Sequence, residues 1–205
     1  MKVSDLRGIL TYVPRFREKI FVVAVDGEVA ASANFSNILL DLAVLRSLSV
    51  KIILVHGAAL QIDRLAAARG VQLSNSDGTG ITDEATLQVS LDAATTLMND
   101  IMQGLTSVDL RATYANIIIA HPAGIIGGVD HQHTGRVERV DKEAISLFLN
   151  AGIIPVIPPI GFDGEGRTFS ERSTARSSRM VEKFGDATTS PSTAMTKVFS
   201  RKRGT

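Results

Sequence analysis

The sequence contains no cysteine among its 205 residues. Disulfide bridges, metal sites built on thiolates and cysteine nucleophiles are therefore all excluded. The formal net charge is only +1, so no overall electrostatic attraction to nucleic acid or to an anionic membrane is expected. No apolar run approaches the ~20 residues that a membrane-spanning helix needs, and the first residues show neither a signal-peptide core nor a cleavage site. We expect a cytoplasmic protein that binds neither membranes nor nucleic acid.

The first third of the chain alternates strand and helix signals. Residues 19–25 (KIFVVAV) and 51–55 (KIILV) are short, apolar and rich in β-branched residues, which is typical of strands covered on both faces. A helical pattern follows each of them. The first can be capped by Asn34 or Ser36, and the second, residues 60–70, ends at a glycine. The β-α-β-α order predicts a parallel sheet with right-handed crossovers.

The middle of the chain adds a long helix and further strands. The long helix is expected to begin after Thr82 as its N-cap, with Asp83 and Glu84 in the first turn, where the helix dipole favours acidic residues. The prolines near residue 158 place the end of the last strand at a sheet edge or a turn. The other expected elements are strands at 116–120, 134–141 and 153–161 and a helix at 142–152.

Composition changes abruptly after residue 169. Residues 170–205 hold 13 serines and threonines and carry 8 basic against 3 acidic residues, whereas residues 1–169 have the apolar residues for a core. The tail has no strand-like apolar run, so we expect it to be disordered or weakly helical around Met180–Phe184. The basic cluster at residues 201–203 is expected to be solvated.

Two of the predicted strands end in turns of small residues, at 25–28 (VDGE) and 55–59 (VHGAA). In a parallel sheet, ligands bind beyond the carboxyl ends of the strands. A helix that opens near Ala59 offers free N–H donors and the positive end of its dipole to a carboxylate or a phosphate. A glycine at such a junction also serves simply to turn the chain, and His56 could either contact a ligand or cap its strand.

Two further groups of side chains have both a chemical and a structural interpretation. His131 and His133 form a His-x-His pair that can chelate a metal. No third ligand cluster accompanies this pair, which favours a structural turn and predicts no metal site. Asp26 and Glu28 could form an acid–base pair, although adjacent carboxylates in a turn are usually solvated.

Six stretches within residues 15–169 together resemble one family. They are FVVAVDGEVA, NFSNILLDLAVLRSLSV, LVHGAALQID, GITDEATL, GVDHQHTGRVERVDKEAI and GFDGEGRTF, in this order. Through them the chain resembles the amino-acid-kinase-type domain of N-acetylglutamate synthases, which is related to acetylglutamate kinase. The resemblance implies a three-layer α/β/α fold with a mainly parallel sheet, similar to the N-terminal lobe of carbamate kinase, over residues 1–169, with 170–205 as a separate tail.

The resemblance also implies a site for a small amino-acid ligand, namely arginine, glutamate or N-acetylglutamate. No catalytic residue is expected, because segment 23–27 lacks the lysine with which the family's kinases neutralise the transferring phosphoryl group. Asp26 stands where the family has the first of two glycines, Gly80 where it has an arginine that pairs with the substrate carboxylate, and Leu60 where it has a proline. The matching ligand-binding positions are Gly27, Glu28, His56, Gly57, Ala58, Ala59 and Thr82.

The function implied is that of a kinase-like regulatory or scaffold domain of an N-acetylglutamate synthase in arginine biosynthesis, not catalytic by itself. The full-length enzymes use acetyl-CoA, whereas this chain is expected to bind no cofactor and to lack both the second lobe and the acetyltransferase domain. Two alternatives remain open: a small-molecule kinase similar to acetylglutamate kinase, and a non-enzymatic partner of a separate acetyltransferase chain. Family members assemble through this fold, so we expect a homo-oligomer.

Overall fold

The centre of the structure is a five-stranded, all-parallel β-sheet. The computed structural model describes residues 16–74, 80–170 and 195–199, the last of these for the backbone only. The strand order is β11-β1-β2-β8-β3, and every neighbouring pair runs parallel, which confirms the predicted parallel sheet. The strands are β1 (Ile20–Val25), β2 (Lys51–His56), β3 (Ala112–Tyr114), β8 (Ile154–Ile157) and β11 (Met195–Phe199).

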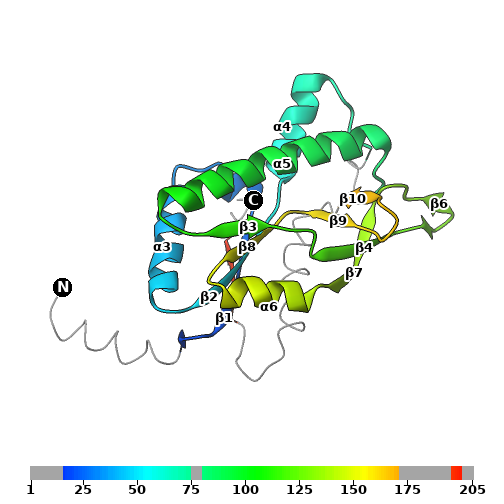
Figure 1. Cartoon of the computed structure of the whole chain (residues 1–205). Coiled ribbons are helices and arrows are strands. Elements are labelled where there is room, and N and C mark those ends of the chain that lie inside the picture. The colour runs from blue at the N-terminus through cyan, green and yellow to red at the C-terminus, as the bar shows by residue number, and fades with distance from the viewer. Residues whose placement is uncertain (1–15, 75–79, 171–194, 200–205) are drawn as a thin grey trace, which may run out of the picture.

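Helices cover both faces of this sheet, as the predicted three-layer α/β/α architecture requires. Successive residues of a strand point to opposite faces, and the core is divided accordingly. Ile52 and Leu54 of β2 pack with α3 (Phe35–Ser47), α4 (Ala59–Arg69) and α5 (Glu84–Ser107), whereas Ile53 and Val55 pack with α6 (Lys142–Asn150). Figure 1 shows α5 along one face and α6 on the opposite face.

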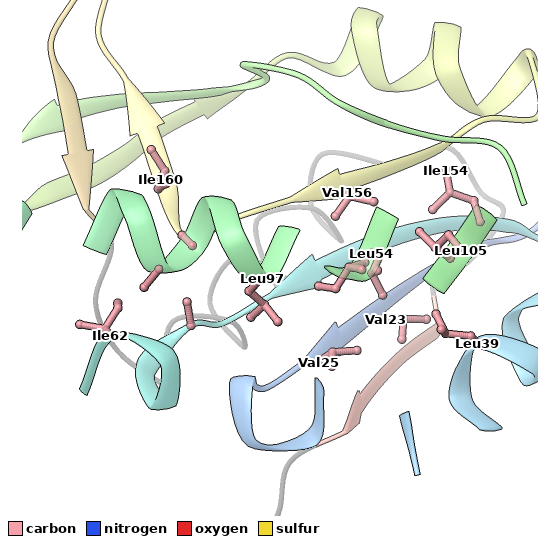
Figure 2. Packing of buried hydrophobic residues seen from close by; sticks show 14 of the residues in the cluster. Val23, Val25, Leu39, Leu54, Ile62, Leu97, Leu105, Ile154, Val156 and Ile160 are labelled. Atoms are coloured by element: carbon pink, nitrogen blue, oxygen red, sulfur yellow. The ribbon is translucent and has the colours of Figure 1, made fainter. Parts of the chain in front are cut away.

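Helix α5 contributes the largest helical part of the larger hydrophobic core. Its 24 residues form the long amphipathic helix that the sequence predicts. Leu97 and Leu105 lie over Leu54 and Ile154 of the sheet, as Figure 2 shows, and Ile101 is fully buried. The apolar stripe of α5 is therefore core, and it fixes the helix against the strands whose ends form the site described below.

The ends of the helices agree in part with the sequence analysis. Gly70 ends α4 in the left-handed conformation, with φ of +65°, as expected. The predicted N-cap of α5 is wrong, because Asp83 and not Thr82 takes this position. The Asp83 carboxylate accepts a hydrogen bond from the Thr86 amide at 2.8 Å. Asn34 is the N-cap residue of α3, but its side chain makes no capping hydrogen bond.

A second, four-stranded sheet continues from the first, in the order β10-β9-β4-β7. Strand β7 is half-exposed and corresponds to the strand expected at 134–141. After β8 the chain turns at Pro158 and Pro159 and enters β9, which confirms that the proline-rich strand ends at a turn. The strands are β4 (Ile118–Pro122), β7 (Gly135–Val140), β9 (Ile160–Phe162) and β10 (Thr168–Ser170), with a hairpin of β5 (Ile125–Ile126) and β6 (Val129–Asp130) beside them.

One segment of the tail differs from the sequence analysis. Residues Met195–Phe199 form β11, which pairs in parallel register with β1 from Phe21 to Val25, although no strand was expected there. MTKVF is too short and too polar to signal a strand by itself, but the edge of β1 offers it unpaired backbone groups. The helix expected around Met180–Phe184 lies outside the described residues. None of the described helices is long and apolar enough to cross a membrane.

Candidate functional site

The two small-residue turns lie side by side at the carboxyl end of the parallel sheet. Val25 at the end of β1 is in register with His56 at the end of β2. Each strand leads directly into a helix: the four-residue α2 (Gly27–Ala30) after β1 and the eleven-residue α4 after β2. The structure thus brings together the predicted site residues of both turns.

The start of α4 has the geometry of an anion site. Its N-cap, Ala58, has no side chain that could accept a hydrogen bond from the helix, so the first-turn amides of α4 are left to other acceptors. The Gly57 amide is already used, because it donates to the Val25 carbonyl at 2.9 Å. Gly57 therefore joins the two strand ends. The amides of α4 that remain for a carboxylate are those of Ala59, Leu60 and Gln61, since the Ile62 amide donates to the Ala58 carbonyl at 2.9 Å.

Gly27 is in contact with a side chain from the neighbouring helix. The Gln61 amide nitrogen donates to the Gly27 carbonyl at 2.9 Å, and a Cβ atom at position 27 would collide with Gln61 Oε1. The absence of a side chain at Gly27 thus makes room for Gln61. Gln61 cannot be identified from the sequence alone, because nothing local marks a residue whose partner lies 34 positions earlier.

The only charged residues in the two turns are acidic. Asp26, the N-cap of α2, is buried, and Glu28 beside it is exposed. Burial, and then the charge of Glu28, raise the pKa of the Asp26 carboxyl above its ordinary value. Neither turn contains a lysine or arginine, so the two turns themselves offer backbone amides but no cationic side chain to an anion.

His56 is buried at the end of β2, with 1% of its surface exposed. By the alternation of the strand it shares the face of Ile52 and Leu54, beneath α4 and α5. Among the residues described, neither ring nitrogen has a hydrogen-bond partner. Burial lowers the pKa of the imidazole from 6.5 to about 4, so His56 is neutral at physiological pH.

Thr82 belongs to a different group of contacts from the other predicted site residues. It is buried, its carbonyl accepts from the His133 amide at 2.9 Å, and its hydroxyl oxygen lies 3.0 Å from that of Thr134. Thr134 also donates to the Gly80 carbonyl. The structure therefore ties Thr82 to the start of β7, and Thr134 is a further residue that the sequence analysis missed.

The His-x-His pair has structural contacts in two directions. His131 Nδ1 lies 3.3 Å from the Gly80 carbonyl, whereas His133 Nε2 lies 3.0 Å from Glu84 Oε2 in the first turn of α5. Across the described part of the chain, no group of three or more histidine, aspartate or glutamate side chains gathers that could hold a metal ion.

Comparison with known sequences places the chain among kinase-like proteins. A model of the amino acid kinase family matches residues 19–182. The amino-acid acetyltransferase of Pseudomonas fluorescens strain Pf-5 is 36% identical over 177 residues, which cover 82% of this chain and 41% of the relative. The corresponding enzyme of Pectobacterium atrosepticum is 34% identical over 89% of this chain and 43% of the relative. The chain thus spans less than half the length of these relatives.

Solved structures agree with the sequence comparison. N-acetylglutamate synthase from Neisseria gonorrhoeae, in complex with coenzyme A and N-acetylglutamate, superposes with a TM-score of 0.79 at 26% identity, over 90% of this chain and 44% of that one. The same enzyme in complex with coenzyme A and L-arginine gives a TM-score of 0.75 at 25% identity over 88% of this chain and 45% of that one. E. coli aspartokinase III, with a TM-score of 0.59 at 13% identity over 88% of this chain and 49% of that one, shares the fold alone.

Proposed function

The chain belongs to the amino acid kinase family, and we propose that it acts as the non-catalytic, kinase-like domain of an N-acetylglutamate synthase in arginine biosynthesis. Its role is regulatory or structural: it offers a site for a small carboxylate ligand at the start of α4 and transfers no phosphoryl group. The likeness to a synthase solved with N-acetylglutamate and with L-arginine supports these two compounds as the ligands to test. No cofactor is assigned to this chain.

The absence of a cation from both turns is the observation that carries this proposal. Phosphoryl transfer requires positive charge, from lysine, arginine or Mg²⁺, to stabilise the charge on the transferring group. Residues 25–30 and 56–62 instead contribute Asp26, Glu28 and a neutral His56. None of these side chains supplies the positive charge that a lysine or arginine in these turns would give to a transferring phosphoryl group.

Binding of a small carboxylate is compatible with the same turns, although it is expected to be weak. The first-turn amides and the dipole of α4 favour a negative group. Two features act against it: the Asp26 carboxylate at the adjacent strand end, and Gly80 at the position of the family's arginine. A lost arginine–carboxylate contact typically costs about 2–5 kcal/mol, so we expect dissociation constants nearer millimolar than micromolar.

Isothermal titration with N-acetylglutamate and with arginine tests the ligand site. We expect measurable binding to the unmodified chain and a loss of at least about tenfold in affinity in Ala59→Glu, which puts a carboxylate where the ligand would sit. Ala67→Glu, on an exposed position of the same helix, is the matched control and should bind as the unmodified chain does. Equal affinity in Ala59→Glu would place the ligand elsewhere, and no heat with either compound would leave only a scaffold role.

Self-association is a further part of the proposal. Leu40 and Val44 lie one turn apart on α3 and are 54% and 58% exposed. A second copy of the chain that packed on this face of α3 would remove both side chains from water. We therefore propose a homo-oligomer.

A further inference from the structure

Two arginine side chains meet at the amino end of the parallel sheet, opposite the site described above. Arg46 lies in the last turn of α3 and donates to the carbonyls of Val50 at 3.0 Å and Gly152 at 3.4 Å. Arg111 immediately precedes β3 and donates to the Ala151 carbonyl at 2.7 Å. Both guanidinium groups therefore converge on the two residues that follow α6.

Gly152 allows the two guanidinium groups to approach the same point. A Cβ atom added at this position would lie 2.9 Å from Arg46 Nη2 and 3.5 Å from Arg111 Nη2. Gly152 has φ of +73°, a conformation that glycine adopts readily and other residues rarely do. The backbone at the end of α6 thus leaves no side chain between the two cations.

No acidic side chain of the described residues forms an ion pair with Arg46 or Arg111. Within residues 16–74 and 80–170, neither guanidinium has a carboxylate oxygen within 4.0 Å. Lys51 at the same end of the sheet is neutralised, because its Nζ lies 3.1 Å from Glu18 Oε2. Like charges that converge without a counter-ion repel each other, so an anion bound between them would stabilise the folded chain.

The contacts at the end of α6 use only some of the N–H donors of Arg46 and Arg111. Cations near the end of a helix interact favourably with the negative end of its dipole, and Arg46 and Arg111 contact the carbonyls of the two residues that follow α6. A guanidinium group has five N–H donors, whereas these contacts use two from Arg46 and one from Arg111. The remaining donors are unused among the described residues, and Arg111 is exposed, so a ligand can reach the pair from solvent.

We propose that Arg46 and Arg111 form a binding site for a doubly charged oxyanion of the phosphate type. Planar guanidinium groups match the oxygens of a phosphate bidentately. Two of them provide the charge for a divalent group, where one would suffice for a carboxylate. The site lies at the opposite end of the sheet from α4, so it is independent of the carboxylate site.

Titration with inorganic phosphate, followed by the backbone amide signals in NMR spectra, tests this site. The Ala151 and Gly152 amides should shift and saturate with phosphate but not with chloride at equal ionic strength. Arg111→Gln should weaken phosphate binding at least about tenfold, since one charge-assisted pair is lost. Arg139→Gln, which removes an exposed arginine from β7, is the matched control and should leave the affinity unchanged.

Three results would overturn the site. The first is the absence of saturable shifts at residues 151 and 152. The second is equal affinity in Arg111→Gln and Arg139→Gln. The third is a response to chloride as large as that to phosphate, which would show general screening of charge. Denaturant unfolding of each variant without phosphate ensures that the comparison is made on folded chains.

Discussion

Lowering the pH from 6.5 to about 4 should reduce the free energy of unfolding by about 3 kcal/mol, because of His56. In the unfolded chain this histidine takes up a proton below its ordinary pKa of 6.5, but in the folded chain only below about 4. A proton bound more tightly by the unfolded state favours unfolding. The stability is therefore intact above pH 6.5 and is lost progressively as the pH falls through this window.

Three carboxyl groups with shifted pKa values also make stability depend on pH, but either with the opposite sign or below pH 4. The pKa of Asp26 is raised by burial and by Glu28, so its protonation favours the folded chain and opposes the effect of His56. Hydrogen bonds, from Thr86 to Asp83 and from Arg69 to Asp92, lower the pKa of those two carboxyls. Their contribution to stability is lost only below their ordinary value of 3.8.

Urea unfolding at a series of pH values measures this effect. His56→Phe removes the titrating ring. The larger phenyl ring should cost some stability in this buried site, but that cost should be the same at every pH. The stability of this variant should be nearly independent of pH between 6.5 and 4. His121→Gln, which removes an exposed histidine, should retain the loss. An equal loss in His56→Phe would assign the acid sensitivity to another group.

Replacing Gly161 with alanine should destabilise the chain by about 1–3 kcal/mol, because the new methyl group has no space. A Cβ atom on Gly161 would lie 2.6 Å from Ala120 Cβ and 3.3 Å from Ile118 Cγ2. Ala120 Cβ is attached directly to the backbone of β4, so it cannot rotate away. Relief requires that β9 moves away from β4, which breaks their packing.

A double-mutant cycle shows whether this contact is the cause. Ala120→Gly removes the opposing methyl group, so Gly161→Ala should cost little in that background. Gly164→Ala is the matched control, since no atom lies within 4 Å of its Cβ position. The free energies come from denaturant unfolding. If Gly161→Ala were equally costly with and without Ala120→Gly, the collision with Ala120 would not be its source.

The sequence predicts best where local pattern and tertiary contacts agree. The apolar β-branched runs at 19–25 and 51–55 become buried parallel strands, and Gly70 ends α4, because in each case the residue type suits its backbone conformation. Thr82 and Asp83 are both good N-caps. Sequence alone cannot choose between them, since the Thr82 side chain is held by Thr134, a residue 52 positions later.

The candidate site shows the same limit. The position of each turn can be predicted from the end of its strand. That the two turns are neighbours can be predicted from the parallel order of the strands. Two contacts depend on the register of β1 against β2, which no local pattern reveals. They are the hydrogen bond from Gln61 to the Gly27 carbonyl and the hydrogen bond from the Gly57 amide to the Val25 carbonyl. The same is true of the burial of His56, and of the arginine pair, whose members are 65 positions apart.

A coupled assay of ADP release tests the central claim that this kinase-like fold is not a kinase. The chain is incubated with MgATP and N-acetylglutamate, and the rate is compared with that of a blank without protein. The absence of cationic side chains from both turns predicts no rate above the blank at any concentration of N-acetylglutamate. Saturable ADP release that depends on N-acetylglutamate, and that Ala59→Glu abolishes, would contradict the claim and assign phosphoryl transfer to the start of α4.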